Sequence, residues 1–164
     1  MHRLTLTPDE SRRIMAGATL LVRPVELYAG CWEEFDPICD DGQWACKCGD
    51  EYDSPFPPPG EECYGAEAWQ VVGGHAEARP RTFRFRIASL DVKRAKDHLS
   101  IADFRAMGLQ WDDSQAVEGR AVNIEKFIRG WYRDFRDWWT DHYPDAPFDT
   151  SWCWVCGIEH ERSD

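Results

Sequence analysis

Four cysteines between residues 31 and 48 suggest the most specific chemistry in this sequence. Cys39, Cys46 and Cys48 are separated by six residues and by one residue, and Cys31 precedes them. Structural Zn²⁺ sites use four tetrahedral ligands that are mostly nitrogen or sulfur. A long segment with no hydrophobic pattern would gain stability from such a site. The spacing therefore predicts a structural zinc site at these four cysteines.

The other cysteines leave alternatives open. Cys63, His75 or an aspartate is an alternative zinc ligand, and free thiols packed among aromatic side chains are the other interpretation. Cys153 and Cys156 have the spacing of a metal-binding or redox pair. They fall in a strand pattern, where residues three apart point to opposite faces. We expect both to be buried as small apolar side chains.

Charge is distributed unevenly along the chain, whose net charge is −11. The segment from Glu26 to Glu67 holds twelve acidic residues and one basic residue, whereas Arg79 to Lys96 holds seven basic residues and one acidic residue. One interpretation is solvated surface. The other is a phosphate-binding strip next to an acidic segment, with Arg84 and Arg86 among its ligand contacts.

A rigid turn precedes one carboxylate. The stretch PFPPPG, residues 55–60, is followed by Glu67, which stands between two alanines and near Trp69. Proline fixes the backbone, so such a turn orients the strand that follows it. A carboxylate beside aromatic rings is partly desolvated, which raises its pKa and suits proton transfer. The alternative is a polar residue on the wet face of a strand.

The elements that position these residues follow from periodicity and capping signals. Thr7, Pro8 and Glu10 form a capping box with proline at the first helical position, and Gly17 is the expected stop. The patterns predict strands at 3–7, 18–22, 62–72, 81–92 and 151–159, helices at 8–16, 100–108 and 123–144, and an inserted loop at 29–62.

Two aromatic patterns predict core and pocket residues. Seven apolar side chains recur at helical spacing in the long helix and predict one buried face: Ile124, Phe127, Ile128, Trp131, Phe135, Trp138 and Trp139. Trp152 and Trp154 share one face of the last strand, and we expect at least one of them to line a pocket. Trp154 is the candidate for stacking on a base.

The totals predict one domain over residues 1–164, long enough to bury a core without disulfides. No apolar run reaches the about 20 residues that a membrane span needs. The first ten residues lack the apolar region of a signal peptide. We therefore expect a cytoplasmic protein with reduced cysteines and no membrane partner.

In order, four stretches resemble the ASCH domain family, a branch of the PUA-like fold, and are most similar to its bacteriophage and prophage members. The stretches are IMAGATLLVRP (14–24), PFPPPGEECYGAEAW (55–69), LSIADFRAMGL (99–109) and FRDWWTDHYPDAPFDTSWCWVCGIE (135–159). The resemblance implies an α+β fold, a small mixed β-barrel flanked by helices, here with a Cys-containing insert. It also implies that Glu67 projects into a cleft beside Trp69.

The resemblance implies an amidohydrolase site only in part. Family members that act on N4-acetylcytidine use a Lys-x-x-Thr pair with a glutamate, but Ala18 and Leu21 occupy the lysine and threonine positions here. Thr19 and Glu67 remain as candidate nucleophile and acid/base. A nucleophile without its activating base is weak, which argues against an enzyme.

Three functions follow from this comparison. The first is a module that binds RNA, DNA or a modified nucleotide, with Arg23 on a phosphate and Trp69 in the cleft, as the resemblance implies. The second is a small amidohydrolase on an acylated nucleoside. The third is a phage accessory protein whose acidic insert binds a nucleic-acid-binding host protein in the host cytoplasm.

Overall fold

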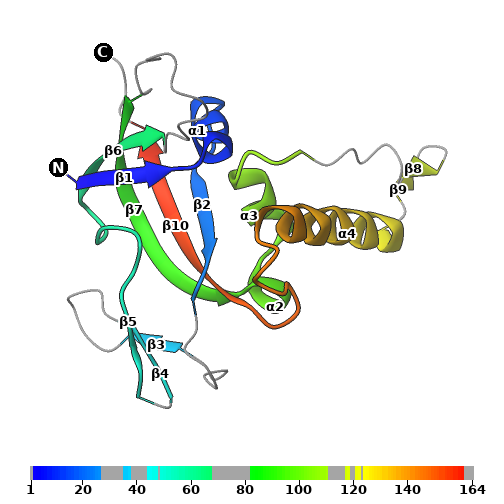
Figure 1. The fold of residues 1–164 in the computed structure, drawn as a ribbon. Helices are drawn as coiled ribbons and strands as arrows, with labels where there is room; N and C mark the ends of the chain where they lie inside the picture. Colours follow the sequence, from blue (N-terminus) through cyan, green and yellow to red (C-terminus); the bar gives the residue numbers. More distant parts are fainter. Residues whose placement is uncertain are drawn as a thin grey trace, which may run out of the picture.

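The computed structural model describes residues 2–26, 35–37, 44–47, 49–67, 82–110, 117–118, 121–122 and 124–160. The predicted α+β class is confirmed, with a five-stranded mixed sheet in the order β1-β6-β7-β10-β2 and helices packed beside it (Figure 1). The strands of this sheet are β1 (His2–Leu6), β2 (Leu20–Pro24), β6 (Glu62–Glu67), β7 (Thr82–Arg94) and β10 (Trp152–His160). The helices are α1 (Pro8–Met15), α2 (Ala95–His98), α3 (Ile101–Ala106) and α4 (Ile124–His142).

Helices α1 and α3 begin where their capping residues predict. Thr7 Oγ1 accepts from Glu10 N at 3.1 Å, and Glu10 Oε2 accepts from Thr7 N at 2.8 Å. Ser100 and Asp103 form the same reciprocal box at the start of α3. Gly17 follows α1 with φ 98° and Gly108 follows α3 with φ 76°, a conformation that L side chains rarely adopt.

The sheet does not close into the predicted barrel. Strand β1 pairs with β6 in parallel, the other ladders are antiparallel, and β1 and β2 are the outermost strands of the order. No ladder joins β1 to β2 within the described residues. A side chain spans this gap instead, because Arg23 Nη2 on β2 donates to Thr5 O on β1 at 2.7 Å.

Two hydrophobic cores lie on the two sides of the sheet. One core holds Leu6 of β1, Phe85 of β7 and Trp154 of β10, together with Ile14 of α1. The other packs the outward side chains of β2 and β10 against α3 and α4, whose buried members include Phe135 and Trp139. Strand β10 therefore contributes alternate side chains to both cores.

The described part of the insert is not structureless. It holds β3 (Phe35–Pro37), β4 (Trp44–Cys46) and β5 (Glu51–Tyr52), which form a small antiparallel sheet. Cys46, Tyr52 and Phe56 pack into the core of the main sheet. These strands are two or three residues long, so they carry no periodicity that a sequence pattern could reveal.

Helix α4 buries only part of its predicted apolar face. Phe135 and Trp139 are buried, but Ile124 is 69% exposed and Ile128 is 52% exposed. Figure 1 shows the first half of α4 extending away from the sheet, toward the short hairpin of β8 (Val117–Glu118) and β9 (Ala121–Val122). Within the described residues, no helix has the length and apolarity that a membrane span requires.

Candidate binding pocket

A pocket with a volume of about 760 Å³ lies between α1, the end of β2, and the turn after β5. We call it the inner pocket. Its aromatic lining comes from Tyr52, Tyr143 and Trp154, and its polar lining includes Glu10, Arg23, Glu26, Asp53 and Ser54. An aromatic wall with a few convergent polar groups is the usual composition of a small-molecule site.

An ion pair between Glu10 and Arg23 forms one wall of the inner pocket. Arg23 Nε donates to Glu10 Oε1 and Arg23 Nη2 donates to Glu10 Oε2, both at 2.8 Å. The Arg23 guanidinium also lies over the Phe56 ring, 5.1 Å from its centre. Burial disfavours the charged form, but the hydrogen bonds and charge of Glu10 outweigh burial and raise the pKa of Arg23.

Tyr143 connects this wall to the end of α4. Its hydroxyl donates to Val22 O at 2.7 Å. Burial, followed by the negative charge of Glu10, raises the pKa of Tyr143. The phenol therefore stays protonated and can remain a hydrogen-bond donor at neutral pH.

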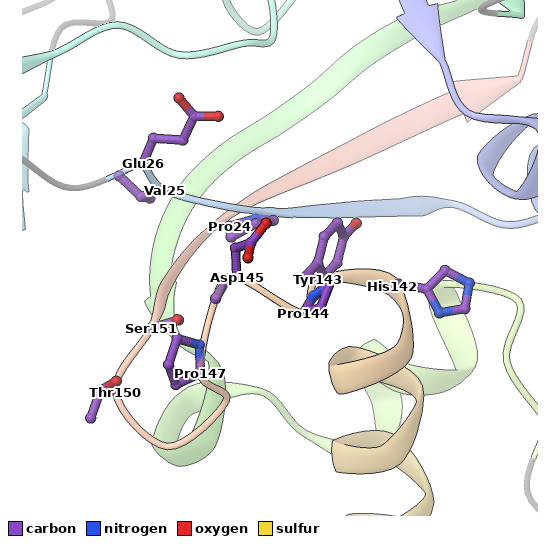
Figure 2. A pocket seen from close by; sticks show the side chains of 11 residues that line it. Pro24, Val25, Glu26, His142, Tyr143, Pro144, Asp145, Pro147, Thr150 and Ser151 are labelled. Carbon is purple, nitrogen blue, oxygen red and sulfur yellow. The ribbon is translucent and has the colours of Figure 1, made fainter. Parts of the chain in front are cut away.

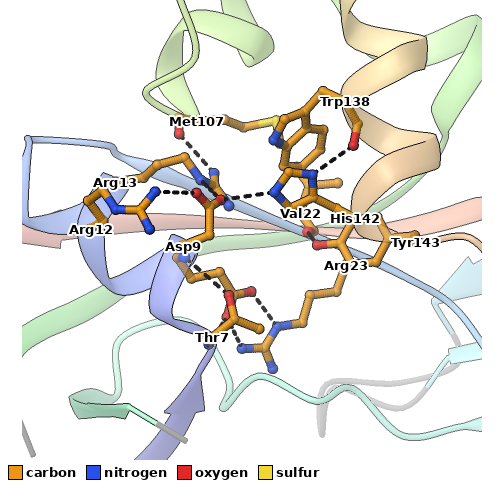
Figure 3. Close-up of polar contacts among 11 residues, drawn as sticks. Thr7, Asp9, Arg12, Arg13, Val22, Arg23, Met107, Trp138, His142 and Tyr143 are labelled. Atoms are coloured by element: carbon orange, nitrogen blue, oxygen red, sulfur yellow. Dashed lines mark hydrogen bonds and ion pairs between the residues drawn. The ribbon is translucent and has the colours of Figure 1, made fainter.

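Asp9 joins α1 to α3 and α4 behind Tyr143. Its carboxylate accepts from Arg13 Nε at 2.8 Å and lies 3.5 Å from His142 Nε2 (Figure 3). Arg13 also donates to Met107 O and lies over the Trp138 ring. These contacts fix the helix ends that carry Glu10 and Tyr143 into the pocket.

A second pocket of about 470 Å³ lies on the other side of the Pro24–Glu26 segment. Figure 2 shows Pro24, Val25 and Glu26 above it, with Tyr143 and Asp145 projecting from the segment after α4. It shares Tyr143 and the Pro24–Glu26 segment with the inner pocket. The two pockets therefore form neighbouring parts of one concave region.

The inner pocket is electrostatically negative. Arg23 neutralises Glu10, whereas Glu26 and Asp53 are exposed carboxylates on the rim. This balance disfavours a phosphate in the pocket and favours groups that donate hydrogen bonds to carboxylates.

Two of the predicted ligand-binding residues meet in the inner pocket. Arg23 and Trp154 are register partners on β2 and β10, so both project from the same face of the sheet. Trp154 also contacts Trp44 edge-to-face, with 5.9 Å between ring centres. Trp152 is buried beside Trp154 on that face but does not line the pocket.

Arg84 and Arg86 lie elsewhere, on the exposed face of β7. Arg86 Nη2 is 3.5 Å from Glu62 Oε1, and Arg86 is also the register partner of Glu159. Arg79 and Arg81, two further bases of the segment from Arg79 to Lys96, lie outside the described residues. The predicted phosphate strip and the inner pocket are therefore two separate surfaces.

Of the two predicted catalytic residues, Thr19 does not line the inner pocket, and Glu67 is described only at its backbone. Thr19 is exposed, with its N donating to Ala106 O at 2.8 Å and its O accepting from Ile158 N at 2.9 Å. Glu67 ends β6, with its backbone paired to Leu6. Trp69 lies outside the described residues.

The predicted zinc ligands are described only at Cys46, which forms a disulfide bond. Cys31, Cys39 and Cys48 lie outside the described residues. A disulfide sulfur is not a thiolate ligand, so the described part of the insert differs from the expected reduced state. No group of three or more potential metal ligands occurs among the described His, Cys, Asp and Glu side chains.

Cys153 and Cys156 are confirmed as buried side chains on opposite faces of β10, one in each core. Burial raises the pKa of both thiols, to about 12 at Cys156. Neither is a thiolate at neutral pH, so a redox or metal role is disfavoured.

Sequence reasoning missed Glu10, Tyr52 and Tyr143 as pocket residues. In the sequence, the capping box already accounts for the presence of Glu10, so nothing indicates that its carboxylate is also the partner of Arg23. Tyr143 precedes Pro144 at the end of α4, and this helix stop was its only local signal. Its place in the pocket depends on packing between distant elements.

Comparison with known proteins finds no protein similar to this chain. No family model, no curated protein and no solved structure matches the chain. The ASCH resemblance therefore stays a prediction from the quoted motifs, and the pocket geometry is the main guide to function.

Proposed function

We propose that this protein is a nucleic-acid- or nucleotide-binding module with a PUA-like fold of the ASCH type. The observation that carries the proposal is the inner pocket, where Arg23 and Trp154 lie together with Tyr52 and Tyr143. Tyr52 and Trp154 are 5% and 3% exposed and form the base of the pocket, so the half-buried Tyr143 is the ring that can stack on a base. Carboxylates at the rim accept hydrogen bonds from the amino groups of a base.

The charge of the inner pocket narrows the class of ligand that the pocket can bind. Because Glu26 and Asp53 repel an anion at the rim, the pocket suits the base or nucleoside part, with any phosphate held outside it. A volume of about 760 Å³ lies within the range of about 300 to 1,000 Å³ that is usual for small-molecule sites.

Isothermal titration with a panel of nucleosides, including N4-acetylcytidine, and their 5′-monophosphates tests this proposal. We expect at least one nucleoside to bind more tightly than its monophosphate. The double variant Glu26→Gln/Asp53→Asn removes the rim charge, so it should reduce or reverse that preference. The matched control is Glu51→Gln/Asp97→Asn, which removes two exposed carboxylates outside the pocket.

Two outcomes would oppose the proposal. If no nucleoside or nucleotide binds, the inner pocket is not a base site. If binding occurs but the rim variant behaves as the control does, the ligand binds elsewhere.

Turnover of acylated nucleosides that stops in Glu67→Gln would assign a hydrolase instead. A stable complex with a host protein, without affinity for nucleic acid, would assign the accessory role.

A further inference from the structure

A row of three side chains crosses the exposed face of β1, β6 and β7. Arg3 on β1 is the register partner of Tyr64 on β6, and Tyr64 is the register partner of Arg84 on β7. Register partners on neighbouring strands project from the same face. The two arginines are exposed and Tyr64 is half-buried between them. We call this set the Arg–Tyr–Arg row.

The core residues on these strands point the other way. Leu4, Cys63 and Phe85 alternate with the row and are buried in the core that also holds Leu6 and Trp154. The Arg–Tyr–Arg row is therefore on the opposite side of the sheet from the inner pocket. Figure 1 shows β1, β6 and β7 as neighbouring strands, with α3 and α4 lying beside β2 and β10.

The charges of this row are available. Within the described part of the chain, neither Arg3 nor Arg84 takes part in an ion pair. The next row differs, because Arg86 lies between Glu62 and Glu159 and pairs with Glu62. The positively charged surface of the Arg–Tyr–Arg row therefore does not extend to Arg86, and Tyr64 lies at its centre.

The geometry points to single-stranded nucleic acid as the partner of this face, and we propose that Tyr64 stacks on a base while Arg3 and Arg84 contact flanking phosphates. Adjacent strands are about 4.8 Å apart, so the two arginines lie about 10 Å apart on either side of the ring. Aromatic platforms combined with cationic groups bind single strands through stacking and charge.

The surface chemistry favours this partner over a protein. The large apolar side chains that the described residues expose are Met15, Ile124 and Ile128, and all three lie on or at the end of helices. The Arg–Tyr–Arg row has none of the apolar surface that forms the centre of a protein interface. Duplex DNA keeps its bases stacked, so it offers no free base to Tyr64.

The inference rests on the proposed nucleic-acid-binding function but assigns a surface that the nucleoside titration does not probe. The experiment measures fluorescence anisotropy with single-stranded RNA, single-stranded DNA and a blunt duplex, each about 12 nucleotides or base pairs long. The RNA and DNA arms identify which strand is preferred. Titrations at about 50 and 200 mM salt give the dependence of affinity on salt.

Three sets of variants separate stacking from charge. Tyr64→Leu should weaken single-strand binding about tenfold, whereas Tyr64→Phe keeps the ring and should bind like the unchanged protein. Arg3→Ala/Arg84→Ala should make the slope of log K against log salt less negative by about 1.4, since each phosphate contact contributes about −0.7 to that slope. The matched control is Arg105→Ala/Arg136→Ala, two exposed arginines on α3 and α4.

The results distinguish this inference from the proposed function. Duplex binding as tight as single-strand binding would overturn the inference, as would Tyr64→Leu and Arg3→Ala/Arg84→Ala binding like the control. Nucleoside binding in the inner pocket with no oligonucleotide binding would overturn the inference and leave the proposed function intact. Failure of both nucleosides and oligonucleotides to bind would overturn both.

Discussion

At the scale of single residues, Arg23 has a structural role that differs from the predicted phosphate contact. Its guanidinium joins the carboxylate of Glu10 on α1 to the backbone of β1 at Thr5. Glu10 is 2% exposed, so it depends on this partner. A buried carboxylate that loses its cation keeps the cost of desolvation without the compensating attraction.

We therefore expect Arg23→Met to lower the free energy of unfolding by about 3 to 5 kcal/mol, measured by urea denaturation. Arg12→Met is the control, because Arg12 is exposed and its pair with Asp9 is worth less than about 1 kcal/mol. The double variant Glu10→Leu/Arg23→Met should be more stable than Arg23→Met alone, since it leaves no unpaired carboxylate buried at this position. Equal losses for Arg23→Met and Arg12→Met would contradict the role assigned to this ion pair.

At the scale of elements, the sequence predicted what is decided locally. A capping box located the start of α1, the N-cap residue Ser100 located that of α3, and alternation located β7, because these signals lie within a few residues. The sequence predicted a longer buried face for α4 than the structure shows. Helical spacing shows that Ile124 and Phe135 share a face, but only the fold decides that Phe135 is covered and Ile124 is not.

Two helix-ending glycines give a matched comparison at this scale. A Cβ at Gly17 meets nothing within 4 Å, whereas a Cβ at Gly108 lies 3.2 Å from the Cβ of Ala18. Gly17→Ala should cost about 1 kcal/mol from its positive φ. Gly108→Ala should cost more, because it adds crowding between α3 and the segment after α1. Urea denaturation of the two variants measures the difference, and equal costs would show that the contact relaxes freely.

At the scale of the whole molecule, the candidate functional residues divide between two surfaces. The sequence grouped Arg23, Arg84 and Arg86 as parts of one ligand site, since charge patterns carry no information about which side of a sheet a residue faces. The structure separates Arg23, in the inner pocket, from the two arginines on the exposed face of β7. Only the pairing of strands distant in the chain could reveal this division.

The cysteines of the insert give a prediction for the whole protein. The zinc proposal expects one Zn²⁺ per chain by elemental analysis, lost in Cys39→Ser/Cys46→Ser/Cys48→Ser together with stability. The disulfide at Cys46 predicts instead no metal and a mass that increases on reduction. Cys153→Ser is the control, because Cys153 is a free buried thiol in β10. Stoichiometric zinc in the control but not in the triple variant would support the metal site.

Strand β10 separates the two cores and places one thiol in each, Cys153 on one side and Cys156 on the other. Both are shielded while the protein is folded, so an alkylating reagent reaches each thiol only when its own core opens. The rate of labelling at each thiol therefore reports how often the core around that thiol opens. Equal rates would mean that the protein opens as a single cooperative unit. A faster rate at Cys153 would mean that α3 and α4 separate from the sheet while the core that holds Cys156 stays closed.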